Sequence, residues 1–175
     1  MSADTRFERV VLPHLNAAYT LARYLTRDAS EAEDATQEAI LRAVRYFGTL
    51  RSEADARAWL LAIVRRECHG RRQPQVATVS YDEVPELQLV DPNAQTDTEA
   101  GRAILQHRVR EAVAALPDVL RETVILRELQ QCTYEEIATI TEVPLGTVMS
   151  RLSRARTRLA GMLGGLAPSG EEEYG

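Results

Sequence analysis

The segment that most constrains this chain runs from Thr133 to Leu159. Thr133 followed three residues later by Glu136 has the spacing of a capping box, in which both side chains satisfy backbone N–H groups at the start of a helix. Pro144 suits the first turn of a second helix, where its missing N–H costs nothing. The segment therefore predicts two short helices around a tight turn, which is the pattern of a helix-turn-helix.

The second of these helices has an apolar face and a basic face. Apolar residues recur at helical spacing at Val148, Leu152, Ala155 and Leu159. At about 100° per residue, Arg151, Arg154 and Arg158 share another face, with Thr147 and Ser150 near its start. Arg156 lies in the same stretch, which contains no carboxylate. An isolated arginine face is usually a solvated surface, but after a capped helix and a turn it favours binding in the DNA major groove.

Length and composition limit the class of protein. The chain has 175 residues, 45% hydrophobic and 5% aromatic, which suits one ordinary domain or two small helical ones with aliphatic cores. It contains no apolar run of about 18 residues, and its first residues lack the basic-then-apolar pattern of a secretory signal. We therefore expect a soluble cytoplasmic protein without membrane insertion.

Reactive and metal-binding residue types are sparse. Cys68 and Cys132 are expected to be free thiols, and a redox role for either is the weaker hypothesis. Cys68 adjoins His69, but neighbours on a helix point about 100° apart, which is not metal-ligand spacing. With no nucleophile motif and no Gly-rich phosphate loop, we expect no enzyme activity, no catalytic residue, no small-molecule substrate, no metal and no other cofactor.

Charges are segregated along the chain. The net charge of −5 is unfavourable for a DNA-binding protein only if it is evenly spread. All 21 basic residues are arginine, a side chain suited to bidentate contacts with phosphate and guanine. Residues 73–98 contain no basic residue, five acids and three prolines, which predicts a flexible acidic linker over 73–100. Residues 166–175 are predicted to be a disordered acidic tail.

The expected fold is all-α, with small helical domains at 5–72 and 101–165. In the first, one helix is expected through Val10 to Leu25, and a second opens at Ser30–Glu33 with another capping box. Asp34, Gln37 and Glu38 share one face of that second helix, at i, i+3 and i+4. A third, amphipathic helix contains Trp59 and becomes basic at its end, at Arg65, Arg66, Arg71 and Arg72. The second domain is expected to hold about four helices.

Three motifs, in order along the chain, resemble the extracytoplasmic-function (ECF) sigma factors, the minimal form of the bacterial sigma-70 family. Residues 34–43 resemble region 2.2 of that family. Residues 58–65 resemble regions 2.3 to 2.4, and residues 134–138 with 144–156 resemble region 4.2. The resemblance covers nearly the whole chain. It implies a sigma2-like helical bundle and a sigma4-like helix-turn-helix domain.

The resemblance also implies a function and a set of partners. The chain would be an alternative sigma factor that directs promoter recognition and DNA melting in transcription initiation, regulated by an anti-sigma factor. It would bind promoter DNA and core RNA polymerase, through the β and β′ subunits. The rival interpretation, a stand-alone helix-turn-helix regulator, accounts for residues 101–165 but leaves the Asp34–Glu38 face without a role. A regulator would bind its operator alone, whereas a sigma factor needs core polymerase.

By the same resemblance, functional residues can be assigned. Core polymerase would contact Asp34, Gln37 and Glu38. The minus-10 element would face Arg65, Arg66, Arg71 and Arg72. The minus-35 element would face Thr147, Ser150, Arg151, Arg154, Arg156 and Arg158. The loop Gly48–Arg57 would capture a flipped base, at a cost of a few kcal/mol of stacking, while Trp59 is expected to anchor the core rather than stack on that base.

Four residues depart from the family pattern. Glu142 stands in the turn where glycine is common, so it is expected to adopt a positive φ at a cost in backbone energy, and Met149 stands where lysine is common. Arg66 takes the place of the usual asparagine, and Glu67 takes an apolar position. These departures concern promoter sequence and the detail of minus-10 contacts rather than the class of protein.

Overall fold

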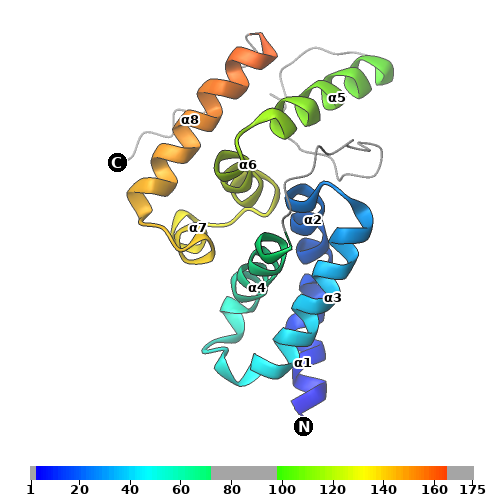
Figure 1. Cartoon of the computed structure of the whole chain (residues 1–175), viewed down its shortest axis with the longest axis vertical. Helices are drawn as coiled ribbons and strands as arrows, with labels where there is room; N and C mark the ends of the chain where they lie inside the picture. Colours follow the sequence, from blue (N-terminus) through cyan, green and yellow to red (C-terminus); the bar gives the residue numbers. More distant parts are fainter. Residues whose placement is uncertain (1–2, 72–97, 165–175) are drawn as a thin grey trace.

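A computed structural model describes residues 3–71 and 98–164 of the chain. These residues form eight α-helices, four short 3-10 or π-helical turns and no strand, which confirms the all-α prediction. Helices α1 to α4 form one group, the first module, and α5 to α8 form the second module (Figure 1). Most of the expected linker, the expected tail and Arg72 lie outside the described residues.

The first module contains α1 (Ala3–Val11), α2 (Leu15–Thr26), α3 (Ala29–Tyr46) and α4 (Ala56–Gly70). Alanines line the buried face of α3, so its backbone can lie close to α2 and α4. Larger side chains of α2 and α4, among them Leu21, Leu60 and Leu61, fill the remaining core and are fully buried. The three helices thus pack around an aliphatic core.

Two local predictions in this module are corrected by the structure. The helix expected through Val10 to Leu25 is interrupted by a 3-10 turn at Leu12–His14, which contains Pro13, a residue that has no N–H to continue a helix. The capping box expected at Ser30 is wrong. Asp28 is the N-cap of α3 instead and accepts a hydrogen bond of 2.8 Å from the Glu31 N–H, so Ser30 already lies inside the helix.

The second module contains α5 (Glu99–Ala115), α6 (Asp118–Val124), a π-helical turn (Ile125–Leu129), α7 (Tyr134–Thr141) and α8 (Leu145–Leu163). Helices α5, α6 and α7 all contact α8. The apolar stripe predicted for α8 is buried against them, at Val148, Leu152, Ala155 and Leu159. The predicted helix-turn-helix is therefore formed by α7 and α8.

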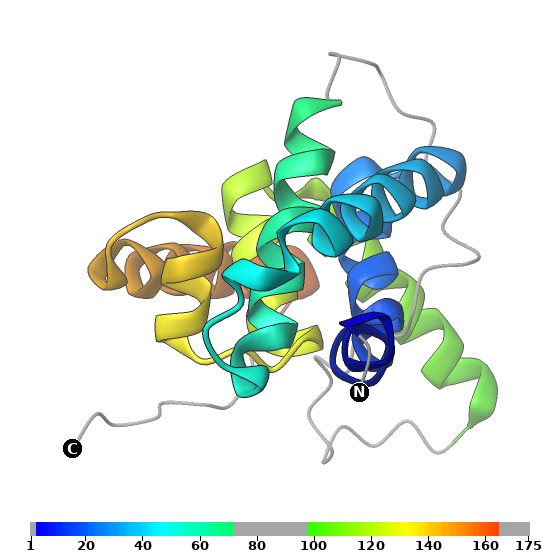
Figure 2. The same cartoon turned by 90° about the horizontal axis from the view of Figure 1, so that it is seen from below.

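The two modules are in contact. Helix α4 packs against α7, and α2 packs against α6 and the π-helical turn that follows it. In Figures 1 and 2, which are turned by 90° from each other, α4 lies beside the second module in both views. Helix α4 therefore belongs to the core of the first module and also faces the second.

Candidate nucleic-acid and polymerase interfaces

The turn between α7 and α8 is fixed by both of its helix ends. Thr133 and Glu136 form the predicted capping box, with hydrogen bonds of 2.7 and 3.1 Å between their side chains and each other's backbone N–H. At the other end Glu142 is the C-cap, in the left-handed region at φ 57°, and its N–H bonds to the Ala138 carbonyl. This conformation favours glycine, so the sequence-based expectation that Glu142 adopts a positive φ is met at some cost in backbone energy.

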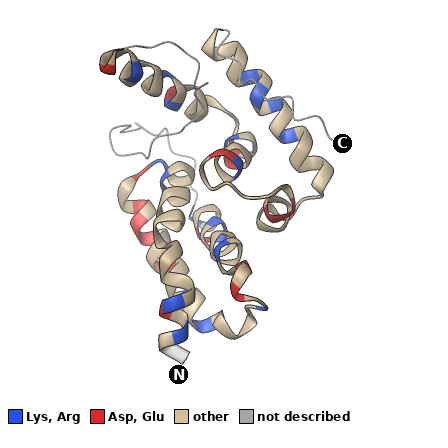
Figure 3. Cartoon of the chain, turned by 180° about the vertical axis from the view of Figure 1, so that it is seen from behind, with Lys and Arg blue, Asp and Glu red and all other residues tan. Residues whose placement is uncertain are grey.

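Helix α8 carries several arginines, which appear as blue segments along it in Figure 3. Arg154 and Arg158 are exposed, and Arg154 donates a hydrogen bond of 3.0 Å to Ser150 Oγ on its own helix. Arg151 is half-buried, as is Arg156, which lies 3.5 Å from the Glu128 carboxylate. The structure thus places every residue predicted to contact the minus-35 element on α8, with Arg156 on the flank that meets an acid of its own module.

The predicted polymerase-binding residues lie on α3. Asp34 and Gln37 are exposed, whereas Glu38 is partly covered and pairs with Arg42 at 3.6 Å. Arg42 also pairs with the buried Glu67, at 2.7 Å between Nε and Oε1. This contact explains how an acid is accommodated at a position where the family has an apolar residue. It also means that the charge of Glu38 is partly offset on its own surface.

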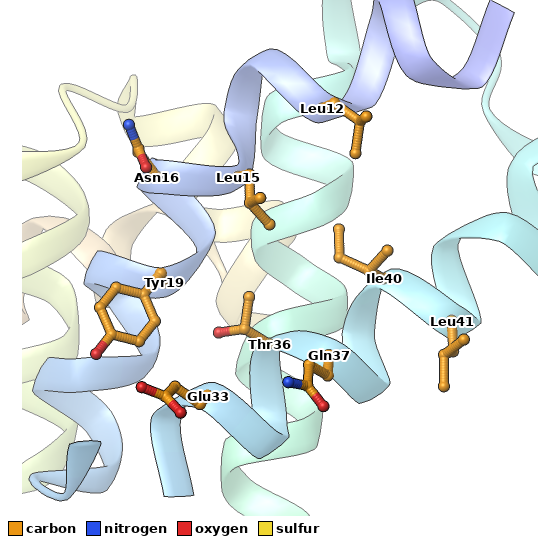
Figure 4. A pocket seen from close by; sticks show the side chains of 9 residues that line it. All are labelled: Leu12, Leu15, Asn16, Tyr19, Glu33, Thr36, Gln37, Ile40 and Leu41. Atoms are coloured by element: carbon orange, nitrogen blue, oxygen red, sulfur yellow. The ribbon is translucent and has the colours of Figure 1, made fainter. Parts of the chain in front are cut away.

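An apolar groove of about 610 Å³ lies beside these residues, between α2 and α3 (Figure 4). Leu12 and Leu15 form one side, Ile40 and Leu41 form the other, and Gln37 lies at its rim. Leu12, Leu15 and Leu41 are 40–56% exposed. Sequence reasoning missed this groove. Its only signals in the sequence are the two leucines that flank Pro13 and the apolar pair Ile40–Leu41 that follows Glu38. Exposed aliphatic residues gathered in one place are typical of a protein-binding surface.

The basic end of α4 meets the second module. The Arg65 guanidinium forms an ion pair with Glu122 of α6, and Arg66 pairs with Glu142 at 2.5 Å. Arg71 is exposed at the C-cap of α4, and Arg72 lies outside the described residues. In the described structure, the residues predicted to contact the minus-10 element therefore do not form one open basic surface.

Glu122 is the buried centre of this contact. Its side chain is 1% exposed, and its carboxylate accepts hydrogen bonds from Arg65 and, at 3.2 Å, from His69 Nε2. Burial raises the pKa of Glu122, but the hydrogen bonds and charges of His69 and Arg65 outweigh that effect and hold the pKa below its usual value. The carboxylate consequently stays ionised within the protein.

The loop that precedes α4 is held by aromatic and ionic contacts. Trp59 is half-buried, with its ring edge-on to Phe47 at 6.5 Å between centroids, and Phe47 meets Phe7 at 5.3 Å. Glu53 pairs with Arg6 at 2.9 Å and with Arg9 at 3.3 Å. These contacts agree with the expectation that Trp59 anchors the core.

The two cysteines are free and buried. Burial raises the pKa of Cys68 to about 12 and that of Cys132 to about 11. Neither thiol is therefore a ready nucleophile in the folded protein. Across residues 3–71 and 98–164, no group of three or more His, Cys, Asp or Glu side chains is placed to hold a metal ion.

Known proteins match this chain over most of its length. Residues 10–73 match the family described as Sigma-70 region 2, and residues 106–159 match Sigma-70, region 4. The RNA polymerase sigma-H factor of Pseudomonas aeruginosa is 34% identical over 160 residues, which cover 86% of this chain and 82% of that protein. The ECF RNA polymerase sigma factor SigM of Mycobacterium tuberculosis is 32% identical over 160 residues, which cover 90% and 77%.

The chain belongs to the ECF sigma factors of the sigma-70 family. Sigma factors are transcription initiation factors that bind core RNA polymerase and promoter DNA.

Two solved structures have the same fold. The sigma factor RpoE of Bartonella quintana, in a co-crystal with the anti-sigma factor NepR, has a TM-score of 0.66 at 25% identity, covering 90% of this chain and 96% of that one. CnrH in complex with the cytosolic domain of CnrY has a TM-score of 0.66 at 19% identity, covering 93% of this chain and 90% of that one. At this identity the likeness supports the fold and nothing further. None of the described helices has the length and apolar character needed to cross a membrane.

Proposed function

We propose that this sigma factor reads the minus-35 element with the outer face of α8. The observation that carries the proposal is that a buried aliphatic stripe fixes the roll of α8, so that Arg154 and Arg158 point to solvent. Thr147, Ser150 and Arg151 lie nearer the start of the same helix, which is the end of a recognition helix that contacts base edges. Arg156 and Arg158 are better placed for phosphate contacts, which position the helix without reading sequence.

The polymerase-binding surface in this proposal combines the α3 face with the apolar groove. Asp34, Gln37 and Glu38 supply polar contacts that fix orientation, and the leucines of the groove supply the area that is removed from water. The expected partner is a helical element of the β′ subunit. Arg65, Arg66, Arg71 and Arg72 would meet the minus-10 element, with the loop Gly48–Arg57 receiving a flipped base.

Regulation by an anti-sigma factor is part of the same proposal. The RpoE structure that resembles this chain was solved with the anti-sigma factor NepR, and CnrH was solved with the cytosolic domain of CnrY. The groove between α2 and α3 has the apolar lining that a helix of such a partner needs. A partner bound there would compete directly with polymerase.

Co-elution with core RNA polymerase and in vitro transcription on genomic fragments together test whether α3 binds the polymerase and α8 recognises the promoter. Asp34→Arg is expected to lose co-elution with core polymerase, because the reversed charge faces the partner surface. Arg154→Glu is expected to keep that association and to lose promoter-specific transcripts. Losing base and phosphate contacts of this kind costs about 1–3 kcal/mol, or roughly 5- to 150-fold in affinity.

Matched charge reversals on other exposed sites serve as controls. Glu8→Arg on α1 and Arg108→Glu on α5 change the charge of the same two modules away from the proposed surfaces. Both are expected to behave like the wild type. Equal losses in the control and test variants would overturn the proposed surfaces, as would binding of the complete promoter, minus-10 element included, by the chain without core polymerase.

A further inference from the structure

The junction between the modules joins acids of the second module to arginines of the first. Glu122 on α6 accepts from Arg65 and His69 of α4, and Glu142 at the end of α7 pairs with Arg66 of α4. We call these five residues the junction clasp. The two partners of each contact lie 53 to 76 residues apart along the chain, so each contact exists only when the two modules are docked.

A second line of hydrogen bonds fixes the same docking. Arg57 of α4 donates to the backbone carbonyl and side-chain oxygen of Gln130, and Gln130 Nε2 donates to the Ala17 carbonyl of α2 at 3.3 Å. Arg27, at the end of α2, donates to the Ala114 carbonyl of α5 at 2.9 Å. The contacts therefore involve both α2 and α4, which fixes the orientation of the second module as well as its distance.

One feature of the clasp is costly unless the modules are docked, and a second feature is unusual. A buried carboxylate is unfavourable without cationic partners, and both hydrogen bonds that the structure shows for the Glu122 carboxylate come from the other module. Glu142 occupies a left-handed backbone position that favours glycine, and its carboxylate pairs with Arg66. Arg66 and Glu142 are also two of the four departures from the family pattern, so two unusual residues meet each other.

We propose that the junction clasp holds the free chain in a closed form that masks the minus-10 surface while leaving the minus-35 surface open. This inference rests on the proposed function of α4 and α8. In the closed form the half-buried Arg65 and the exposed Arg66 are both paired with acids of the second module, whereas Arg154 on α8 is exposed and donates to Ser150 of its own helix. Engagement of the minus-10 element requires the modules to separate, which the 26 residues from 72 to 97 are long enough to permit at about 3.3 Å per residue.

Glu122→Gln combined with Glu142→Gln removes both acidic partners of the clasp and tests the proposal. Glu99→Gln combined with Glu111→Gln removes two exposed carboxylates from α5 of the same module, and so matches the change in net charge.

Spin labels on Ser30→Cys in α3 and Ser153→Cys in α8, both exposed positions, report the distance between the modules. Because burial raises the pKa of both native thiols, the exposed cysteines react first.

The clasp variant is expected to give a longer and broader distance distribution than the wild type and the α5 control. A fluorescent single-stranded oligo-dT serves as the probe for freed arginines, and its affinity is expected to rise about fivefold, the low end of coupling between two sites. Glu142→Gly removes the carboxylate that pairs with Arg66 and is expected to open the chain in part, without loss of helix content because glycine suits the left-handed φ at this position. That variant keeps the test decisive if the double variant folds poorly.

Three results would overturn the inference, in distinguishable ways. An unchanged distance in both clasp variants would show that the clasp does not hold the modules together. A wild-type distance as long and broad as that of the variants would show that the free chain is not closed. A longer distance with unchanged oligo-dT affinity would overturn the masking and count against α4 as a DNA surface, which is a failure of the proposed function rather than of the closed form.

Discussion

The sequence predicts an arginine-rich surface on both α4 and α8. In the folded protein the arginines of the two helices have different partners. On α8 the exposed Arg154 bonds to Ser150 of its own helix, and the half-buried Arg156 meets Glu128 of its own module. On α4, Arg65 and Arg66 form ion pairs with acids of the other module. An arginine-rich helix thus becomes an open surface only where no acid distant in sequence is brought to it.

The largest expected effect comes from removing the packing that orients α8. Leu152 is 1% exposed at the centre of the buried stripe, so Leu152→Ala is expected to lower the free energy of unfolding by about 2–5 kcal/mol, through lost burial and a residual cavity. Urea denaturation followed by circular dichroism measures the change. Ser153→Ala, one residue further on the exposed side, is expected to change stability by less than about 0.5 kcal/mol. Similar losses in both variants would contradict the orientation of α8 described above.

A second comparison uses one arginine from each helix. Arg65→Ala removes an ion-pair partner from a buried carboxylate and is expected to cost about 1–3 kcal/mol in the free energy of unfolding, with His69 still bonded to Glu122. Arg154→Ala is expected to leave stability nearly unchanged and to weaken promoter binding. Thermal unfolding measures the first effect. The contrast between the helices would be lost if both variants had the same midpoint.

What the sequence predicted in these two helices was local. The capping box at Thr133, the apolar stripe of α8 and the positive φ at Glu142 all depend on neighbours within one or two helical turns, and the structure has them. The mistaken cap at Ser30 also shows this limit, because Asp28 offered a competing carboxylate two residues earlier. Patterns of this range were sufficient to predict the fold and both faces of α8.

The junction and the groove could not be predicted in this way. Glu122 reads as an ordinary helix acid, and its partners in the fold, Arg65 and His69, lie 57 and 53 residues away along the chain. The groove needs Leu15 and Ile40 from two helices whose relative position is set by the alanine-lined face of α3. Both features arise from tertiary contacts between segments that no local period relates.

The buried acid also predicts a pH dependence. Because the pKa of Glu122 is held below its ordinary value of 4.5 in the folded protein, its contribution to stability is present above about pH 4.5 and is lost as pH falls through the lower folded value. Wild type and Glu122→Gln should therefore differ in urea stability near pH 6 and converge toward pH 3. Glu99→Gln, on the exposed side of α5, is the charge control. A difference between wild type and Glu122→Gln that does not vary with pH would show that the carboxylate is not ionised in the junction.

The smallest expected effect is a change in the reactivity of the buried thiols. The two thiols respond differently to separation of the modules and to destabilisation of the second module alone. Cys68 of α4 lines a small cavity with Asp118 and Arg121 of α6, so separating the modules exposes it. In the variant Glu122→Gln with Glu142→Gln, the reaction of Cys68 with a disulfide reagent at pH 8 is expected to accelerate about fivefold, the low end of coupling between sites. Peptide mapping by mass spectrometry assigns the rate to each thiol. Leu152→Ala, which weakens the second module but keeps the clasp, should instead accelerate Cys132. If Cys68 responded to Leu152→Ala and not to the clasp variant, its protection would come from module stability, and the contrast between α4 and α8 would need another cause.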